Sequence, residues 1–170
     1  MSFVLWMTGL PCSGKTTIAR ELRNVIHNIA ILDGDELREW LSSKDFSKEG
    51  RNDHNKRVAY LARLLVKHEV PVCVSLISPF IENRETARNI IGSEKFVEIY
   101  VKCSLDVCET RDVKGMYKKA RNNEIKNFTG ISDPYEAPTS PDLVLETEKY
   151  SVEDCVKIIL EYLKAKGINI

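Results

Sequence analysis

The sequence predicts an α/β fold in which a parallel β-sheet is covered by helices on both faces. Short segments that are apolar throughout, such as residues 2–8, alternate along the 170-residue chain with longer segments of helical periodicity. Strands that are apolar on both sides must be buried on both sides, which is the usual state of parallel strands joined by helices. A glycine-rich loop directly after the first apolar segment also favours this class.

The expected elements follow one another without an internal repeat, a linker or a low-complexity segment. The short apolar segments expected as strands are residues 2–8, 29–32, 70–77, 96–101 and 143–145. The segments expected as helices are residues 15–27, 51–69, 82–91 and 152–163. We therefore expect a single domain over residues 1–170, with its ligands bound beyond the carboxyl ends of the strands.

Composition disfavours several classes of function. Lys plus Arg and Asp plus Glu both number 25, and a formal net charge of zero disfavours a nucleic-acid-binding or membrane-surface protein. No segment approaches the roughly 20 apolar residues of a membrane-spanning helix, and the first residues are typical of a strand rather than a signal peptide. Five cysteines without CxxC spacing predict reduced thiols and a cytoplasmic location.

A phosphate-binding motif is the most specific feature of the sequence. Residues 9–16, GLPCSGKT, match G-x-x-x-x-G-K-[ST] at every fixed position, after an expected strand and at the start of an expected helix. Glycines let the backbone curl so that several N–H groups point at phosphate oxygens. Lys15 is expected to neutralise the β- and γ-phosphates of ATP, and Thr16 to bind Mg²⁺. The residues expected to bind the nucleotide here are Gly9, Cys12, Ser13, Gly14, Lys15, Thr16 and Thr17. The motif predicts a P-loop NTPase fold.

A second group of charged residues follows the expected strand at 29–32. Asp33 and Asp35 lie on either side of a glycine, and Arg38 follows three residues later. A carboxylate at this strand end can hold Mg²⁺ or accept the proton of an attacking hydroxyl. We predict this catalytic and metal-binding role for Asp33, together with Lys15 as the catalytic cation. In the alternative, Asp35 caps the helix that carries Arg38, and the two roles are compatible.

Two polar segments interrupt the alternating pattern and are expected to form mobile lids. Residues 42–55 are polar around one aromatic residue, and residues 111–131 are rich in Lys and Arg. The alternative for the second segment is a solvated, charged helix. A lid is favoured because a kinase must exclude water from the phosphate that it transfers.

Blocks of sequence along nearly the whole chain resemble adenylyl-sulfate kinases. They are residues 9–17, LDGDELR at 32–38, FS at 46–47, ISPF at 77–80, KGMYKKAR at 114–121, EIKNFTGI at 124–131 and DPYEAP at 133–138. The last two blocks are highly specific to that family. The resemblance implies transfer of the ATP γ-phosphate to the 3′-hydroxyl of a nucleotide with a 5′ anhydride, in first place adenylyl sulfate. It also implies a homodimer.

The resemblance assigns roles to particular residues. Phe46 and Phe128 match two aromatic residues that sandwich the base of the acceptor, and aromatic faces stack on any base. Arg38 and Arg51 match arginines that hold its 5′ phosphate end, for which a guanidinium fork is suited. Asp33 matches the aspartate that holds Mg²⁺ or acts as base. The residues expected to bind the acceptor are Asp35, Arg38, Phe46, Arg51, His54, Ser78, Lys126 and Phe128.

Two further assignments concern the lid and the serine of the acceptor loop. Arg111 and Lys114 fall in the lid that closes over ATP in the family. Ser78 matches a serine that is sometimes described as a phosphorylated intermediate. We interpret Ser78 as a binding residue, because direct in-line transfer needs no intermediate.

The sequence departs from the family pattern mainly around the acceptor. The loop before Phe46 is shorter by one residue, Gly50 replaces the aspartate of an Asp-Arg pair, and His54 aligns with an acceptor-contacting asparagine. The phosphate loop has LPCS where small residues are usual. These departures open an alternative: short members of the family resemble cytidine diphosphoramidate kinases of capsule biosynthesis. Adenylyl sulfate, and hence sulfate assimilation, is favoured because the core motifs of the family dominate.

Three other classes are weaker alternatives. Residues 112–115 fit the D-x-x-G motif of regulatory GTPases, but no N-K-x-D guanine motif follows. A kinase for sugars or nucleoside monophosphates would share the phosphate loop but not the KNFTG block at 126–130. A nucleotide sensor without catalytic activity is disfavoured because Lys15, Thr16 and Asp33 are all present.

Overall fold

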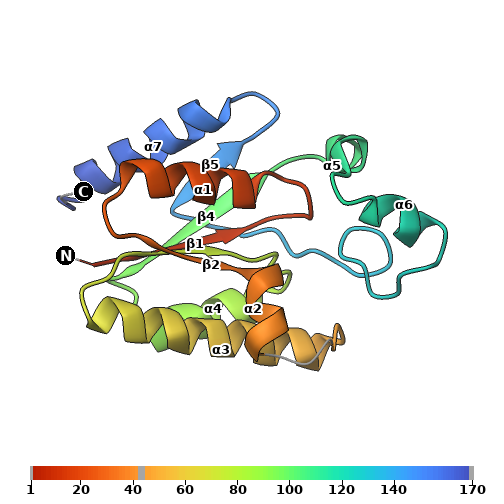
Figure 1. Cartoon of the computed structure of the whole chain (residues 1–170), viewed down its shortest axis with the longest axis horizontal. Coiled ribbons are helices and arrows are strands. Elements are labelled where there is room, and N and C mark those ends of the chain that lie inside the picture. The colour runs from red at the N-terminus through yellow and green to blue at the C-terminus, as the bar shows by residue number, and fades with distance from the viewer. Residues whose placement is uncertain (1, 42–44, 169–170) are drawn as a thin grey trace.

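A parallel five-stranded sheet forms the centre of the protein (Figure 1). The computed structural model describes residues 2–41 and 45–168. The strands are β1 (Val4–Thr8), β2 (Ala30–Asp33), β3 (Val72–Ser75), β4 (Phe96–Lys102) and β5 (Leu143–Glu146). They lie in the order β2-β3-β1-β4-β5, and every neighbouring pair is parallel. The expected α/β class with a parallel sheet is confirmed.

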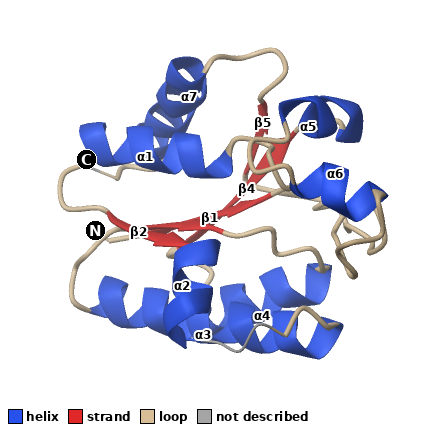
Figure 2. Ribbon diagram, turned by 45° about the vertical axis from the view of Figure 1, so that its right-hand side comes forward, coloured by secondary structure: helices blue, strands red, loops and turns tan. Residues whose placement is uncertain are grey.

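Helices cover both faces of this sheet, as Figure 2 shows. The helices are α1 (Lys15–Val25), α2 (Gly34–Leu41), α3 (Lys48–Lys67), α4 (Ile81–Ile91), α5 (Leu105–Arg111), α6 (Met116–Arg121) and α7 (Val152–Ala165). Helices α1 and α7 lie on one face, and α3 and α4 on the other with α2 beside them. In the described residues, no helix is both long and apolar enough to cross a membrane.

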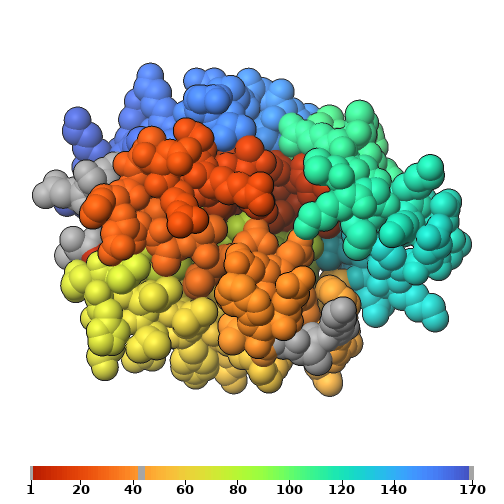
Figure 3. All heavy atoms as spheres, in the orientation of Figure 1, coloured from red at the N-terminus to blue at the C-terminus, as the bar shows by residue number. Residues whose placement is uncertain are grey.

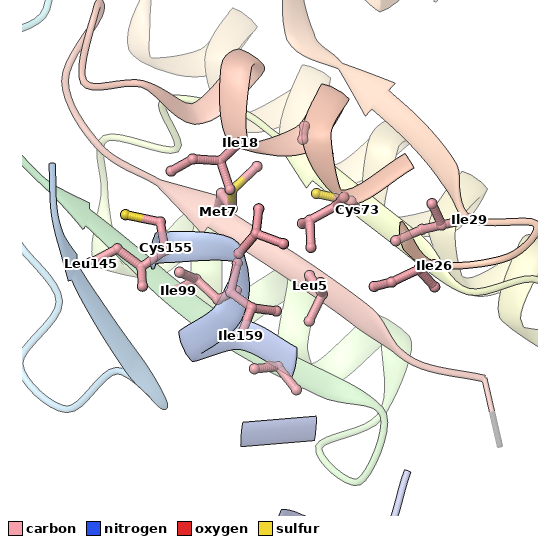
Figure 4. Packing of buried hydrophobic residues seen from close by; sticks show 14 of the residues in the cluster. Leu5, Met7, Ile18, Ile26, Ile29, Cys73, Ile99, Leu145, Cys155 and Ile159 are labelled. Atoms are coloured by element: carbon pink, nitrogen blue, oxygen red, sulfur yellow. The ribbon is translucent and has the colours of Figure 1, made fainter. Parts of the chain in front are cut away.

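The uniformly apolar first strand is explained by two separate cores. Leu5 and Met7 pack with Ile99 and other residues under α1 and α7 (Figure 4), whereas Val4 and Trp6 face α3 and α4. Alternate residues of a strand point to opposite faces, so a strand that is covered twice must be apolar at every position. A third, small cluster lies in the segment with α5 and α6, away from the sheet cores.

Several element boundaries differ from the sequence expectation, and the largest difference concerns residues 42–55. Helix α3 begins at Lys48, and the side chain of its N-cap residue Ser47 accepts a hydrogen bond from the Gly50 backbone N–H. Residues 48–55 therefore form the first two turns of a long helix, while residues 42–44 lie outside the described residues. Polar composition did not prevent this, because a capped helix needs only one buried stripe.

Candidate active site

The phosphate loop, residues 9–16, lies between β1 and α1 at the carboxyl end of the sheet. A Cβ atom on Gly9 would lie 2.5 Å from the carbonyl oxygen of Val101, so only glycine fits there. Lys15 Nζ donates to the carbonyl oxygens of Gly9 (2.9 Å) and Leu10 (2.7 Å). Burial lowers the pKa of Lys15 to about 8. The loop thus holds a desolvated ammonium group at the place where phosphate oxygens are expected.

Two oxygen ligands suited to Mg²⁺ meet beside this loop. Thr16 Oγ1 donates to Asp33 Oδ2 at 2.9 Å, and Asp33 Oδ1 accepts from the backbone N–H of Asp35 at 3.1 Å. Ser75 Oγ lies 3.4 Å from Thr16 Oγ1. Mg²⁺ in kinases takes only one or two protein oxygens and keeps several waters, so this small hard-oxygen pair fits the ion. The described residues contain no larger cluster of His, Cys, Asp and Glu side chains able to hold a metal.

The segment with α5 and α6, in which the sequence predicts a lid, contacts the phosphate loop through Arg111. Its guanidinium donates to the carbonyl oxygen of Thr147 at 2.8 Å and lies 3.4 Å from the carbonyl oxygens of Cys12 and Ser13. Thr147 itself donates from Oγ1 to the Ser13 carbonyl oxygen at 2.7 Å. The structure therefore brings Arg111 to the loop that was expected to bind ATP, and adds Thr147, which sequence reasoning missed.

A second lid cation connects the lid with α2. Lys114 Nζ pairs with Asp35 Oδ2 at 2.5 Å, and this hydrogen bond raises the pKa of Lys114. In Figure 3 the lid (green) and α2 (orange) meet beside the phosphate loop (dark red). Both partners are exposed, so the pair contributes little stability, typically below about 1 kcal/mol. Its position nevertheless places two expected site residues across the mouth of the phosphate site.

Two arginines, Arg38 on the helix that begins after Asp33 and Arg51 on α3, lie close to each other and form a candidate anion site. Burial and then the nearby charge of Arg51 lower the pKa of Arg38. The Arg38 guanidinium lies 4.5 Å from the ring centroid of Phe46. Arg51 is buried and donates to the carbonyl oxygen of Asn127 and to Thr129 Oγ1, and it pairs with Asp133 at 3.2 Å. A bound anion would relieve the repulsion between the two guanidinium groups.

The two aromatic residues expected to stack on a base lie in different surroundings. Phe46 is 47% exposed, whereas Phe128 is buried and packs edge-on against Tyr117 with ring centroids 4.9 Å apart. Phe128 belongs to the small lid cluster that also contains Cys103 and Cys108. The polar composition of residues 122–127 hid this cluster from sequence reasoning. Lys126 is exposed two residues before Phe128.

Ser78 and His54 lie in the interior of this structure. Ser78 Oγ donates its hydroxyl hydrogen to Asn55 Oδ1 at 2.6 Å and accepts a hydrogen bond from Trp6 Nε1 at 3.1 Å. The imidazole of His54 is buried, and burial followed by the charge of Arg38 lowers its pKa to about 4. His54 is therefore neutral at physiological pH.

A cavity of about 420 Å³ lies beside the partners of Arg51. Its lining residues are Ser47, Lys48, Phe80, Asn127, Asp133, Pro134 and Glu136. The cavity joins the start of α3 to the chain that returns from the lid to β5. It therefore lies next to Ser47, which follows Phe46 in the chain, and next to the two residues that contact Arg51, Asn127 and Asp133.

The family follows from a comparison with known proteins. The model of the adenylylsulphate kinase family matches residues 1–146. The chain belongs to this family. It is 47% identical over 168 residues to the adenylyl-sulfate kinase of Halothermothrix orenii. This alignment covers 96% of this chain and 90% of the relative. It is 48% identical over 170 residues to the enzyme of Clostridium acetobutylicum, covering 97% and 84%.

A solved structure supports the same assignment. The Mycobacterium tuberculosis APS kinase in complex with AMPPNP and APS superposes with a TM-score of 0.89 at 35% identity, covering 96% of this chain and 98% of that chain. As a member of the adenylylsulphate kinase family, the protein is a kinase with the P-loop fold, a phosphotransferase that acts on an alcohol group. The GTPase and sensor alternatives are thereby set aside.

Proposed function

We propose that this kinase transfers the γ-phosphate of ATP to the 3′-hydroxyl of adenylyl sulfate. The observation that carries the proposal is the pair of neighbouring guanidinium groups of Arg38 and Arg51, because Arg38 lies on α2, the helix that begins directly after Asp33. One side of the site suits the phosphates of ATP and Mg²⁺, and the other suits the anionic 5′ end of a second nucleotide. Phe46, which is half exposed next to Arg38, offers a ring for its base.

The chemistry follows from these positions. The 3′-oxygen of the acceptor attacks the γ-phosphorus, the bond from that phosphorus to the bridging oxygen of ADP breaks, and the hydroxyl proton passes to Asp33. Lys15 stabilises the negative charge that develops on the β- and γ-phosphate oxygens, and Arg111 closes the nucleotide side of the site. Thr16 and Asp33 would hold Mg²⁺, which would supply further positive charge to these oxygens.

A second acceptor is favoured by one structural observation. A Cβ atom on Gly50 would lie 2.5 Å from both the carbonyl oxygen and the Cγ atom of Asp45. The loop that carries Phe46 is therefore built around a residue without a side chain. Because this loop faces the base of the acceptor, a cytidine nucleotide with a 5′ diphosphoramidate is the alternative substrate.

The deciding experiment measures ADP release with ATP and Mg²⁺ and either adenylyl sulfate or CDP-phosphoramidate as acceptor. Reactions without acceptor and with the Lys15→Ala variant serve as controls. A strong preference for adenylyl sulfate supports the proposal. A strong preference for the cytidine compound would replace the acceptor while keeping the reaction, and inertness toward both would overturn the acceptor class altogether.

We also propose that the protein acts in the cytoplasm as a homodimer. Its five cysteines are free thiols, which suits a reducing compartment. Large apolar side chains are exposed on α2 and α3, namely Trp40 (68%), Tyr60 (52%) and Leu64 (53%). Exposed side chains of this kind support an interface between copies. Light scattering should give twice the mass of one chain, and a monomer at micromolar concentration would contradict this.

A further inference from the structure

A buried arginine outside the reaction centre joins three parts of the acceptor region. Arg84, in the first turn of α4, is 3% exposed. Its guanidinium donates to the carbonyl oxygens of Ser78 and Glu136, each at 2.6 Å, and its Nε pairs with Glu98 Oε1 at 2.9 Å. A buried charge is costly unless it is paired and hydrogen-bonded, and here both terminal nitrogens donate hydrogen bonds while Glu98 supplies the opposite charge.

The two carbonyl groups belong to segments that are far apart in the sequence. Ser78 lies in the loop of residues 76–80 that follows β3, which we call the acceptor loop. Glu136 lies in residues 127–136, the return arm of the lid. The same two segments are joined by the Glu136 N–H, which donates to the Pro79 carbonyl oxygen at 2.8 Å. The Glu136 carboxylate in turn accepts from the Ile81 N–H at the start of α4, at 2.7 Å.

We call the contacts of Arg84 with the acceptor loop and the return arm the junction. From the junction, the return arm extends toward both the candidate anion site and the phosphate loop. Asp133, three residues before Glu136, pairs with Arg51 of the candidate anion site. The hydroxyl groups of Tyr135 and Thr8 are hydrogen-bonded at 2.9 Å, and Thr8 donates to the Ile77 carbonyl oxygen at 2.7 Å. Thr8 directly precedes the phosphate loop. The junction at Arg84 therefore connects the acceptor loop and the return arm next to the site of phosphate transfer.

The backbone conformation of Ser78 depends on contacts such as those at this junction. Ser78 has a φ of 42°, in the left-handed region that a residue with a side chain adopts only when its surroundings impose it. The hydrogen bond from Arg84 to the Ser78 carbonyl is one such constraint; Thr8 Oγ1 also donates to this carbonyl at 3.2 Å, and further hydrogen bonds hold the Ser78 hydroxyl. Loss of Arg84 would release both this conformation and the return arm.

We propose that Arg84 is a positioning residue, which fixes the acceptor loop against the return arm of the lid and so sets the acceptor-binding geometry through Asp133 and Arg51. The assignment to the acceptor side rests on the proposed function. Arg84 contacts no reacting group itself. Misplacement of a binding group by about 1 Å can cost on the order of 100-fold in rate, so the effect should be large although the residue is remote.

The test compares Arg84→Gln with the matched variant Arg88→Gln. Arg88 lies one turn later on α4 and pairs with the same Glu98 carboxylate (3.5 Å) and with Asp142 (3.2 Å). We expect Arg84→Gln to raise KM for the acceptor about tenfold or more while KM for ATP changes less than about twofold. Arg88→Gln should leave both within about twofold, and Arg84→Lys, which keeps the pair with Glu98, should recover part of the loss.

Hydrogen exchange gives a second readout that needs no acceptor. In Arg84→Gln the backbone amides of residues 76–80 and 129–137 should exchange about tenfold faster, whereas Arg88→Gln should match the wild type. Equal exchange and equal KM values in the two variants would overturn the positioning role. If the wild type turns over neither acceptor, the proposed function fails, and the exchange result alone decides about Arg84. Should Arg84→Gln not fold, Arg84→Lys is compared with Arg88→Lys in the same measurements.

Discussion

Tyr117, in lid helix α6, donates a hydrogen bond of 2.8 Å from its hydroxyl to the carbonyl oxygen of Pro11 in the phosphate loop. Its ring is buried in the lid cluster beside Phe128. The hydroxyl group of Tyr117 thus connects the lid to the phosphate loop, while its ring is packed inside the lid. Such a contact orients the lid, because one end of the residue is packed in the cluster and the other is hydrogen-bonded to the loop.

Replacement of Tyr117 by Phe should weaken ATP binding selectively. The ring stays packed while the hydrogen bond, worth about 1 kcal/mol, is lost, so KM for ATP should rise about fivefold with little change in KM for the acceptor. Steady-state kinetics with each substrate varied in turn would measure this. The control is Tyr162→Phe on helix α7, which removes a hydroxyl hydrogen bond to Asp142 and should change neither constant. Equal effects of the two variants would contradict the role of Tyr117.

Asp33→Asn should lower kcat by about 100- to 10,000-fold, the usual contribution of a positioned general base. The amide cannot accept the hydroxyl proton and is a weaker ligand for Mg²⁺, so the Mg²⁺ concentration for half-maximal activity should also rise. A Mg²⁺ titration of ADP release measures both effects. Asp53→Asn, which breaks an exposed pair with Arg57, is the control. Activity within about threefold of wild type in Asp33→Asn would exclude Asp33 as the base.

ATP affinity should depend on pH through Lys15. Its pKa is lowered to about 8 by burial, so the ammonium form that binds phosphate predominates below pH 8 and is lost as the pH rises through that value. The dissociation constant of ATP should therefore rise above pH 8 by up to about tenfold per pH unit. Equilibrium titrations from pH 7.5 to 9.5 would measure it. Lys15→Arg stays charged throughout and should show no such rise; a flat wild-type profile would refute the prediction.

The two aromatic residues should respond differently to truncation. Phe46→Ala should raise KM for the acceptor about 5- to 100-fold, corresponding to about 1–3 kcal/mol of base stacking. Since Phe46 is half exposed, the free energy of unfolding should change by less than about 0.5 kcal/mol. Phe128→Ala, in contrast, should lower the free energy of unfolding in addition to any effect on KM, because it leaves a cavity in the lid cluster. Urea titrations alongside kinetics separate the effects, and an unchanged acceptor KM in Phe46→Ala would remove it from the base site.

The nucleotide side of the site could be predicted from sequence because its residues lie at sites that the topology brings together. Thr16 lies in the first turn of α1 and Asp33 ends β2, and the carboxyl ends of parallel strands gather at one edge of the sheet. Their hydrogen bond of 2.9 Å is the direct result. The acceptor side was less predictable: His54 and Ser78 were expected to contact substrate, yet their side chains are buried.

The amino-acid sequence by itself determined the parallel sheet, the phosphate loop and the type of reaction, because strand burial and loop geometry depend on residues that are close in the chain. Only the tertiary structure decided how the lid and the acceptor loop are held. Arg84 reaches Glu136 across 52 residues, Tyr117 reaches Pro11 across 106, and Thr147 reaches Ser13 across 134. Each is a side chain bonded to a distant backbone carbonyl, and since every residue carries such a carbonyl, no pattern in the sequence marks the partner.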